Sequence, residues 1–201
     1  MHQAQLERFL CEALEVETGG AQIYEAAIEC AENEELREEW GEYLAQTREH
    51  ARILRNVCER LGIDAEQRPP GREIARATAE ALLDNIRRAR ESGDSSLAQI
   101  VAAEAVTLAE AKDHLDWQLI GLIAKESKKG DHIGEILQEA FDQVEDQEEE
   151  HLFHSTGWAR ELWAQSLGLD AVFPPPEEKL GTKVPKKTER EVLKQRSKQN
   201  R

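Results

Sequence analysis

Helical periodicity is the feature of this sequence that most restricts its fold. Apolar residues recur at spacings of three and four along nearly the whole chain, and the alternation of apolar and polar residues that is typical of strands is almost absent. Turn-forming residues interrupt the pattern, so helices are predicted over residues 5–32, 34–61, 73–91, 96–125 and 132–167. The fold class is therefore expected to be all-α, built around one core, since 201 residues fit one domain of ordinary size.

The order of the predicted helices favours a bundle. The first two form one antiparallel hairpin and the last two another, and the shorter helix at 73–91 lies in the connection between the hairpins. Two hairpins joined by a long crossover are a known connectivity of four-helix bundles. Gly19 and Gly20 fall in the middle of the first helix, where each costs about 1 kcal/mol relative to alanine. We expect them to permit close approach of another helix or a local bend, and not to end the helix.

The composition changes abruptly after Leu169. Pro174, Pro175 and Pro176 introduce a polar segment, and residues 171–201 carry nine Lys/Arg and four Glu, a net charge of +5. The formal charge of the whole chain is −15, so residues 1–170 carry −20. These differences predict a bundle domain over residues 1–170 and a disordered basic tail over 171–201. The tail either only aids solubility or contacts an acidic protein surface, a nucleic acid or an anionic membrane.

The charge balance and the cysteine pattern exclude several classes of protein. Acidic residues outnumber basic ones by 41 to 26, which argues against a protein that coats nucleic acid. No apolar run reaches the roughly 18 residues of a membrane helix, and the first residues lack the features of a signal peptide, so a cytoplasmic location is expected. Cys11, Cys30 and Cys58 are widely spaced and form no Cys-x-x-Cys pair, which favours buried free thiols over a thiolate metal site.

One pair of residues in the last predicted helix has the spacing of metal ligands. Glu148 and His151 stand three residues apart, which places both on one helix face and lets both reach one ion. Dinuclear metal sites in bundles combine such Glu-x-x-His pairs with carboxylates from the other two helices. His50 occupies the corresponding place in the second helix, but Thr47 stands where its paired glutamate is expected. A run of glutamates with one histidine can also be a solvated helix face.

Glu17 and Glu110 are the candidate ligands from the first and third long helices. Each is followed seven residues later, two turns along the helix, by an aromatic residue, Tyr24 or Trp117. The aromatic ring therefore lies on the same face as the carboxylate and could wall the site without contacting the metal. The alternative is that both rings are ordinary core residues beside chance glutamates.

Distances from the predicted turns indicate which of these residues meet. Glu17 and His50 lie about equally far from the turn of the first hairpin, so they reach the same level. Glu110 reaches the level of Glu148 and His151 by the same count. Asp113, one turn beyond Glu110, could replace the missing glutamate. The predicted metal ligands are Glu17, His50, Glu110, Asp113, Glu148 and His151.

These motifs make the chain similar to the ferritin-like superfamily, and most closely to the branch typified by the YciE and YciF stress proteins. The resemblance covers about residues 5–165 and is carried by residues 33–36, 43–50, 59–62 and 109–113. Thr47 matches the Leu-x-x-Thr-x-x-His/Gln segment of that branch, and Asp113 stands where the branch has the second glutamate of a Glu-x-x-Glu pair. The resemblance implies a ferritin-like four-helix bundle, homodimers, and binding of two iron or manganese ions, but no defined physiological activity.

Functions of different classes are consistent with these residues. The first is a metal-binding protein whose dinuclear iron or manganese centre carries out ferroxidase- or peroxidase-type oxidation in protection against stress. The second is a non-catalytic helical scaffold with a degenerate metal site and a basic tail that recruits a partner, and Thr47 favours it. A cargo or assembly role, with the tail bound to a shell or to an anionic surface, is a third. The cost of burying Glu17, Glu110 and Glu148 without a cation favours the first.

Overall fold

Five α-helices make up the part of the chain that the computed structural model describes, residues 2–128 and 130–169, and no strand occurs there. The helices are α1 (Gln3–Ile28), α2 (Glu34–Leu61), α3 (Pro70–Glu91), α4 (Ser95–Glu126) and α5 (His132–Ser166). The all-α prediction is confirmed, and every predicted helix is present to within about one turn at its ends. The predicted disordered tail, 171–201, lies outside the described residues. None of the five helices combines the length and the apolarity needed to cross a membrane.

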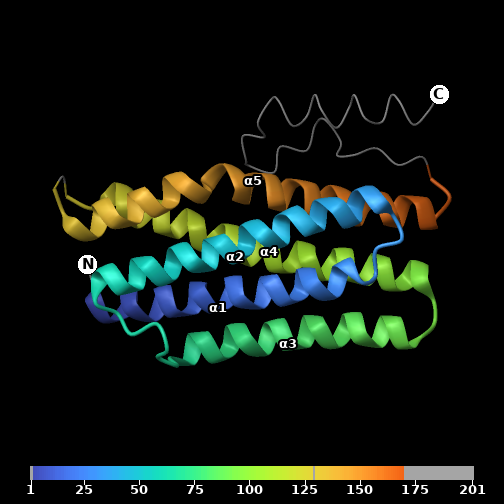
Figure 1. Ribbon diagram of the computed structural model, residues 1–201, viewed down its shortest axis with the longest axis horizontal. Helices are drawn as coiled ribbons and strands as arrows, with labels where there is room; N and C mark the ends of the chain where they lie inside the picture. Colours follow the sequence, from blue (N-terminus) through green and yellow to red (C-terminus); the bar gives the residue numbers. More distant parts are fainter. Residues whose placement is uncertain (1, 129, 170–201) are drawn as a thin grey trace.

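The helices run side by side along the long axis of the molecule (Figure 1). α1 packs against α2 and α4 against α5, so each pair forms an antiparallel hairpin as predicted. Contacts of α1 with α4 and of α2 with α5 join the hairpins into a four-helix arrangement. α3 lies outside this arrangement and packs across α1 and α4. The opposite side, between α2 and α5, is not covered by any described helix.

Short polar side chains and a glycine set the ends of several helices. The Asn33 side-chain oxygen accepts hydrogen bonds from two backbone N–H groups of the first turn, which caps α2. The side chains of Asp94 and Asp131 each accept one such hydrogen bond and cap α4 and α5. Gly62 follows α2 with a φ of 69°, a left-handed conformation that glycine adopts without strain. These turns are therefore encoded locally.

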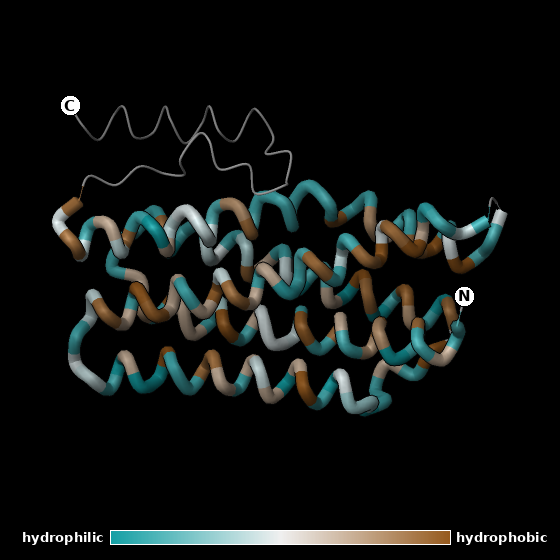
Figure 2. The backbone as a smooth tube through the Cα atoms, turned by 180° about the vertical axis from the view of Figure 1, so that it is seen from behind, coloured by the Kyte–Doolittle hydropathy of each residue, from teal (hydrophilic) through white to brown (hydrophobic). Residues whose placement is uncertain are grey.

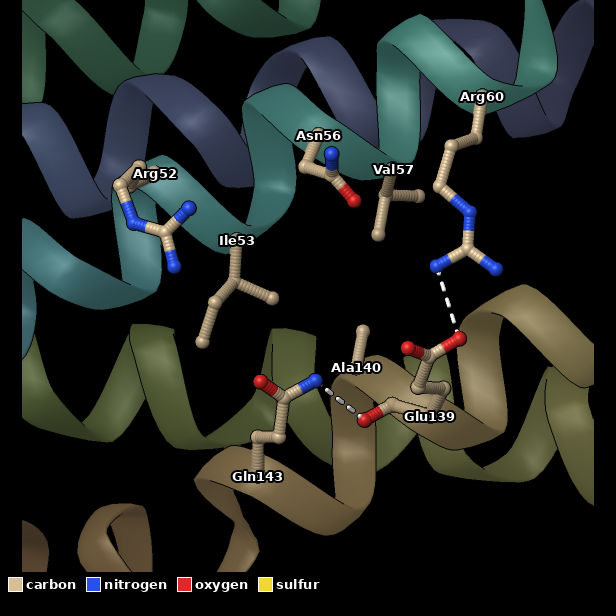
Figure 3. A pocket seen from close by; sticks show the side chains of 8 residues that line it. All are labelled: Arg52, Ile53, Asn56, Val57, Arg60, Glu139, Ala140 and Gln143. Atoms are coloured by element: carbon tan, nitrogen blue, oxygen red, sulfur yellow. Dashed lines mark hydrogen bonds and ion pairs between the residues drawn. The ribbon is translucent and has the colours of Figure 1, made fainter.

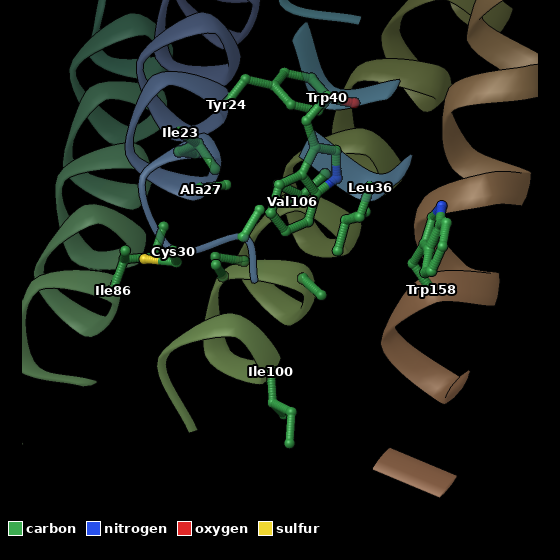
Figure 4. Close-up of a cluster of buried hydrophobic side chains, with 14 of the residues drawn as sticks. Ile23, Tyr24, Ala27, Cys30, Leu36, Trp40, Ile86, Ile100, Val106 and Trp158 are labelled. Atoms are coloured by element: carbon green, nitrogen blue, oxygen red, sulfur yellow. The ribbon is translucent and has the colours of Figure 1, made fainter. Parts of the chain in front are cut away.

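Two apolar clusters fill the bundle, one toward each end. One contains Trp40 and Ile86 and draws on all five helices (Figure 4). The other contains Leu54 and Trp117. Hydrophobic residues recur between hydrophilic ones along each helix (Figure 2), which is the pattern that buries one face and exposes the other. The three cysteines are buried free thiols, as predicted: Cys11, Cys30 and Cys58.

Gly19 marks a very close approach of α1 to α3. A Cβ atom on Gly19 would lie 2.6 Å from the Cβ atom of Ala79. Two carbon atoms cannot approach so closely, so one of the two helices would have to move to make room for it. α1 continues through Gly19 and Gly20 without a break. The close approach expected from this glycine pair is therefore confirmed at Gly19, and it is what lets α3 pack against the bundle.

We predict that Gly19→Ala lowers the free energy of unfolding by about 1–3 kcal/mol, because overpacking between α1 and α3 outweighs a helix-propensity gain of about 1 kcal/mol. Gly41→Ala is the matched control, since a Cβ atom on Gly41 meets nothing within 4 Å. The control should stabilise the protein by up to about 1 kcal/mol. Urea unfolding of both variants measures the difference, and a stabilised Gly19→Ala protein would contradict the prediction.

Candidate metal centre

A layer of buried carboxyl and imidazole groups separates the two apolar clusters. It receives side chains from α1, α2, α4 and α5 and none from α3. Residues three apart on α4 and on α5 share the inner face of their helix, so each of these helices presents two such groups near one level. The groups are 4% exposed or less and are the six predicted from the sequence: Glu17, His50, Glu110, Asp113, Glu148 and His151.

One group of three lies between α1, α2 and α5. The Nδ1 atom of His50 is 3.0 Å from Glu148 Oε1 and 3.6 Å from Glu17 Oε1. One oxygen or nitrogen atom from each residue lies within 4.8 Å of the other two, a spacing that lets a single cation contact all three. The structure therefore brings Glu17 and His50 to the same level, as predicted.

A second group of three lies between α4 and α5 and shares one member with the first. The Nδ1 atom of His151 is 3.5 Å from Glu110 Oε2 and 3.9 Å from Glu148 Oε1, and the three atoms that would contact an ion again lie within 4.8 Å of one another. Because Glu148 belongs to both groups, its carboxylate lies between two possible cation positions and could bridge them.

Two glutamine side chains fix the orientation of both imidazole rings. His50 Nε2 lies 2.7 Å from Gln147 Oε1, and His151 Nε2 lies 2.6 Å from Gln46 Oε1. An amide oxygen only accepts hydrogen bonds, so each Nε2 carries a hydrogen and donates it. In the neutral ring each Nδ1 then turns a lone pair toward the carboxylates. This is the arrangement of a histidine that binds a metal through Nδ1.

Burial raises the pKa of three carboxyl groups in this layer. The pKa values of Glu17 and Asp113 lie well above the ordinary range, first because both groups are buried and then because each faces another carboxylate. Burial and the charge of Glu110 raise the pKa of Glu148 to about 8. Burial lowers the pKa of His50, which disfavours the imidazolium that would otherwise balance these charges. Without a cation, the layer must therefore hold protons on its carboxyl groups at neutral pH.

Many polar atoms of the layer have no hydrogen-bond partner among the described residues. Buried polar atoms are nearly always paired, because an unpaired one costs about 1–3 kcal/mol. Within the described part of the chain, the two histidines are the only basic side chains within 4 Å of these carboxylate oxygens, and no lysine or arginine pairs with them. A bound cation would satisfy these atoms together. They are Glu17 Oε2, Glu110 Oε2, Asp113 Oδ1, both Glu148 oxygens, and Nδ1 of His50 and His151.

Trp117 and Tyr24, the two aromatic residues predicted to wall the site, line the layer. The Trp117 Nε1–H donates a hydrogen bond to Glu17 Oε1 over 2.6 Å, and its ring lies edge-on to His50 with centroids 5.9 Å apart. The Tyr24 ring lies edge-on to His151 with centroids 6.3 Å apart. Burial, and then the charge of Glu110, raises the pKa of Tyr24, so this phenol stays protonated.

Thr47 occupies the position where a paired glutamate was expected. Its side chain is buried on the same face of α2 as His50, and its Oγ1 has no hydrogen-bond partner in the described part of the chain. Asp113 faces Glu17, whose charge, after burial, raises the pKa of Asp113, and it belongs to neither group of three. The layer thus contains four carboxyl groups although position 47 supplies none.

Two glutamines and a tyrosine–histidine pair beside the layer were not predicted from the sequence. Gln46 and Gln147 each stand four residues before a predicted ligand, so Gln-x-x-x-His occurs in both α2 and α5, a repeat that could have identified them. The Tyr43 ring lies 4.2 Å from that of His151 by centroid distance, and the Tyr43 hydroxyl lies 2.6 Å from His154 Nδ1. No spacing links Tyr43 to His154, because they stand on different helices.

A groove opens between α2 and α5 beside this layer (Figure 3). Ile53, one turn after His50, and Gln143, one turn before Gln147, lie on its walls. Glu139 is the one acidic residue among those that line it, and its carboxylate pairs with Arg60 over 2.8 Å. The groove is therefore not a second metal site, but it brings solvent to within one turn of His50.

Comparisons with known proteins do not identify a family for this chain. No family model matches it, and neither a curated protein nor a solved structure matches it. The ferritin-like resemblance therefore stays a prediction, and the function has to be argued from the buried layer itself.

We predict that Gln46→Leu and Gln147→Leu each weaken binding of a divalent metal by about 10- to 100-fold, because each removes the partner that orients one histidine. Gln143→Leu is the matched control. It makes the same substitution one turn away on α5, where the side-chain amide donates a hydrogen bond to the backbone oxygen of Glu139 and not to a histidine. Competition for Mn²⁺ with a chelator of known affinity measures the effect. Equal affinities in the wild type and all three variants would contradict the prediction.

We predict that the metal-free protein loses stability as the pH rises toward 8. The pKa of Glu148 in the folded protein, about 8, lies above its unfolded value of about 4.3. The stability linked to this proton is therefore fully present below the unfolded pKa and is lost as the pH rises through the folded pKa. Urea unfolding in the presence of a chelator, at several pH values, measures the slope.

The isosteric variant Glu148→Gln is the control for this pH dependence. It carries no charge at position 148, so its slope should be flatter, and without metal at pH 8 it should be more stable than the wild type. A wild-type stability that stays constant or increases toward pH 8 would count against the assignment of a raised pKa to this layer.

Proposed function

We propose that this chain is a ferritin-like protein that binds two divalent metal ions in the layer at the middle of its bundle. The preferred metal is iron, and manganese is the alternative. The observation that carries the proposal is the pair of imidazole Nδ1 atoms, each turned toward carboxylates by a glutamine on the other side of the ring. The proposed ligands are Glu17, His50 and Glu148 for one ion and Glu110, Glu148 and His151 for the other.

The charge of the layer supports two ions better than one. The four buried carboxylates, Glu17, Glu110, Asp113 and Glu148, carry −4 when ionised, and two divalent cations carry +4. One ion would leave two uncompensated negative charges in an apolar bundle, which is costly. Asp113 of α4 supplies the fourth negative charge and so replaces the charge of the glutamate that was expected at position 47.

The donor atoms support the choice of metal. Carboxylate oxygens and imidazole nitrogens suit iron and manganese, whereas soft thiolates select other metals and clusters. The three cysteines lie in the apolar clusters, outside the layer. The same donor atoms also bind zinc, so zinc content has to be measured together with iron and manganese.

A bound di-iron centre would supply oxidation of Fe(II) by O2 or peroxide, a ferroxidase- or peroxidase-type activity suited to protection against oxidative stress. Trp117, Tyr24 and Tyr43 exclude water from the layer, since all three are almost completely buried. Trp117 also holds the Glu17 carboxylate through its indole N–H. Because the side chains around the layer are held before any ion binds, little reorganisation opposes metal binding.

The connectivity of the helices supports the ferritin-like part of the proposal. Two antiparallel hairpins joined by a long crossover match bundles of that type, and α3 lies in the crossover. In this proposal residues 1–170 form the bundle domain of a homodimer. Residues 171–201 form a separate basic tail that contacts an acidic protein surface or a nucleic acid.

A non-catalytic scaffold is the alternative that Thr47 favours. Threonine supplies no bridging carboxylate, so Glu148 alone is shared by the two groups of three. In this alternative, protons on the buried carboxyl groups take the place of metal, and the basic tail recruits a partner. The two proposals differ in metal content.

Elemental analysis after anaerobic loading with Fe(II) and desalting tests the proposal. We expect about two irons per chain in the wild type, and loss of both in Glu148→Ala/His151→Ala, because Glu148 is shared between the two positions. The matched control is Glu145→Ala/Asp146→Ala, two exposed acidic residues of the same helix, which should bind as the wild type does. A protein that retains no iron, manganese or zinc would overturn the proposal and leave the scaffold.

A further inference from the structure

An uncovered row of leucines runs along the outer face of α4. Nine large hydrophobic side chains are exposed in the described part of the chain, and five of them are leucines of this one helix. Three of these leucines, 48% to 61% exposed, follow one another at intervals of seven residues. At 100° per residue, the row occupies a strip about 60° wide. This leucine strip consists of Leu97, Val101, Leu108, Leu115, Leu119 and Leu122.

The leucine strip carries far less charge than the rest of the surface. One residue in three of the whole chain is charged, and residues 1–170 carry −20. Between the ends of the strip, Glu104 is the one charged residue at the same helical angle, and its carboxylate accepts a hydrogen bond from Trp163 Nε1 over 2.7 Å. Ala111 and Gln118, exposed beside the strip, are uncharged. A leucine-rich surface poor in charge is typical of the core of a homodimer interface.

The shape and charge of the strip favour another helix over a lipid surface. The strip is narrow and straight, as in a helix-to-helix seam, whereas a helix that lies on a membrane has a broad apolar face flanked by basic residues. Anionic headgroups would also be repelled by the charge of −20 on residues 1–170. Two acidic copies of this chain repel each other except where charge is low, and the strip is such a place.

We infer that the homodimer of the proposed function, on which this inference rests, forms through the leucine strips of the two α4 helices, antiparallel about a two-fold axis. An axis midway between Leu108 and Leu115 sets Leu108 of each copy against Leu115 of the other, and Val101 against Leu122, so the central part of the strip is complementary to itself. Leu119 then lies opposite Glu104, whose carboxylate is already held by Trp163. The seam from residue 101 to residue 122 is about 30 Å long. It uses the outer face of α4, whereas Glu110 and Asp113 lie on the inner face, so the pairing does not depend on the proposed metal centre.

Sedimentation equilibrium of the full chain tests the pairing. We expect a dimer in the wild type and a dissociation constant raised by about 100-fold in Leu115→Glu, because the variant places two like charges at the centre of the seam. Ile74→Glu is the matched control, since Ile74 is an apolar residue of α3 that is exposed outside the strip, and it should leave the dimer intact. Circular dichroism and metal content should be unchanged in both variants.

Cysteine cross-linking tests the register of the two helices. The double variant Leu108→Cys/Leu115→Cys should form an interchain disulfide on oxidation, and neither single variant should, because the residue opposite each position is the other one. The native cysteines are buried and do not compete. A wild-type monomer up to about 100 µM would overturn the inference and point to another cover for the strip, such as residues 170–201. A dimer unaffected by Leu115→Glu, or one cross-linked by a single variant, would overturn it as well.

Discussion

The burial of four carboxyl groups without a lysine or arginine partner is the constraint on which the rest of this structure depends. The contrast with Glu15 shows that the chain can supply basic partners for a buried glutamate. Glu15, also buried and only two residues from Glu17, is paired over 2.7 Å with both Arg72 and Arg76 of α3, and its pKa is lowered although burial alone would raise it. The inward-facing acids receive no such partner among the described residues. They lie between two apolar clusters that offset their cost and keep water away, so a cation or protons must balance them.

Much of the fold and of the centre could be predicted because the relevant signals lie within single helices. The spacing of apolar residues located all five helices, and the ends of α2 lie at Asn33 and Gly62, two residues whose capping chemistry is local. The level of each acidic residue followed from its distance to a turn, since rise per residue is constant in a helix. This count brought Glu17 to His50, and Glu110 to the Glu-x-x-His pair of α5, as the structure has them.

What could not be predicted depends on how the helices are rotated against one another. The Gln46 amide meets the histidine of α5 and not the one on its own helix, and the Tyr43 hydroxyl meets His154 across the α2–α5 seam. Asp113 shares a face with Glu110. Its angular position on α4, however, directs its side chain toward Glu17 and leaves it outside both groups of three. Spacing along one helix determines a level and a face, but the pairing of side chains across helices requires the packed structure.

The most direct test of the central claim is a crystal structure of the metal-loaded protein with anomalous data collected at the absorption edge of the bound metal. Two anomalous peaks are predicted in the buried layer, one beside Glu17 and His50 and one beside Glu110 and His151, with the Glu148 carboxylate between them. Metal found only at exposed acidic residues, or a layer whose carboxyl groups bond one another without any peak, would show that protons and not cations balance these charges.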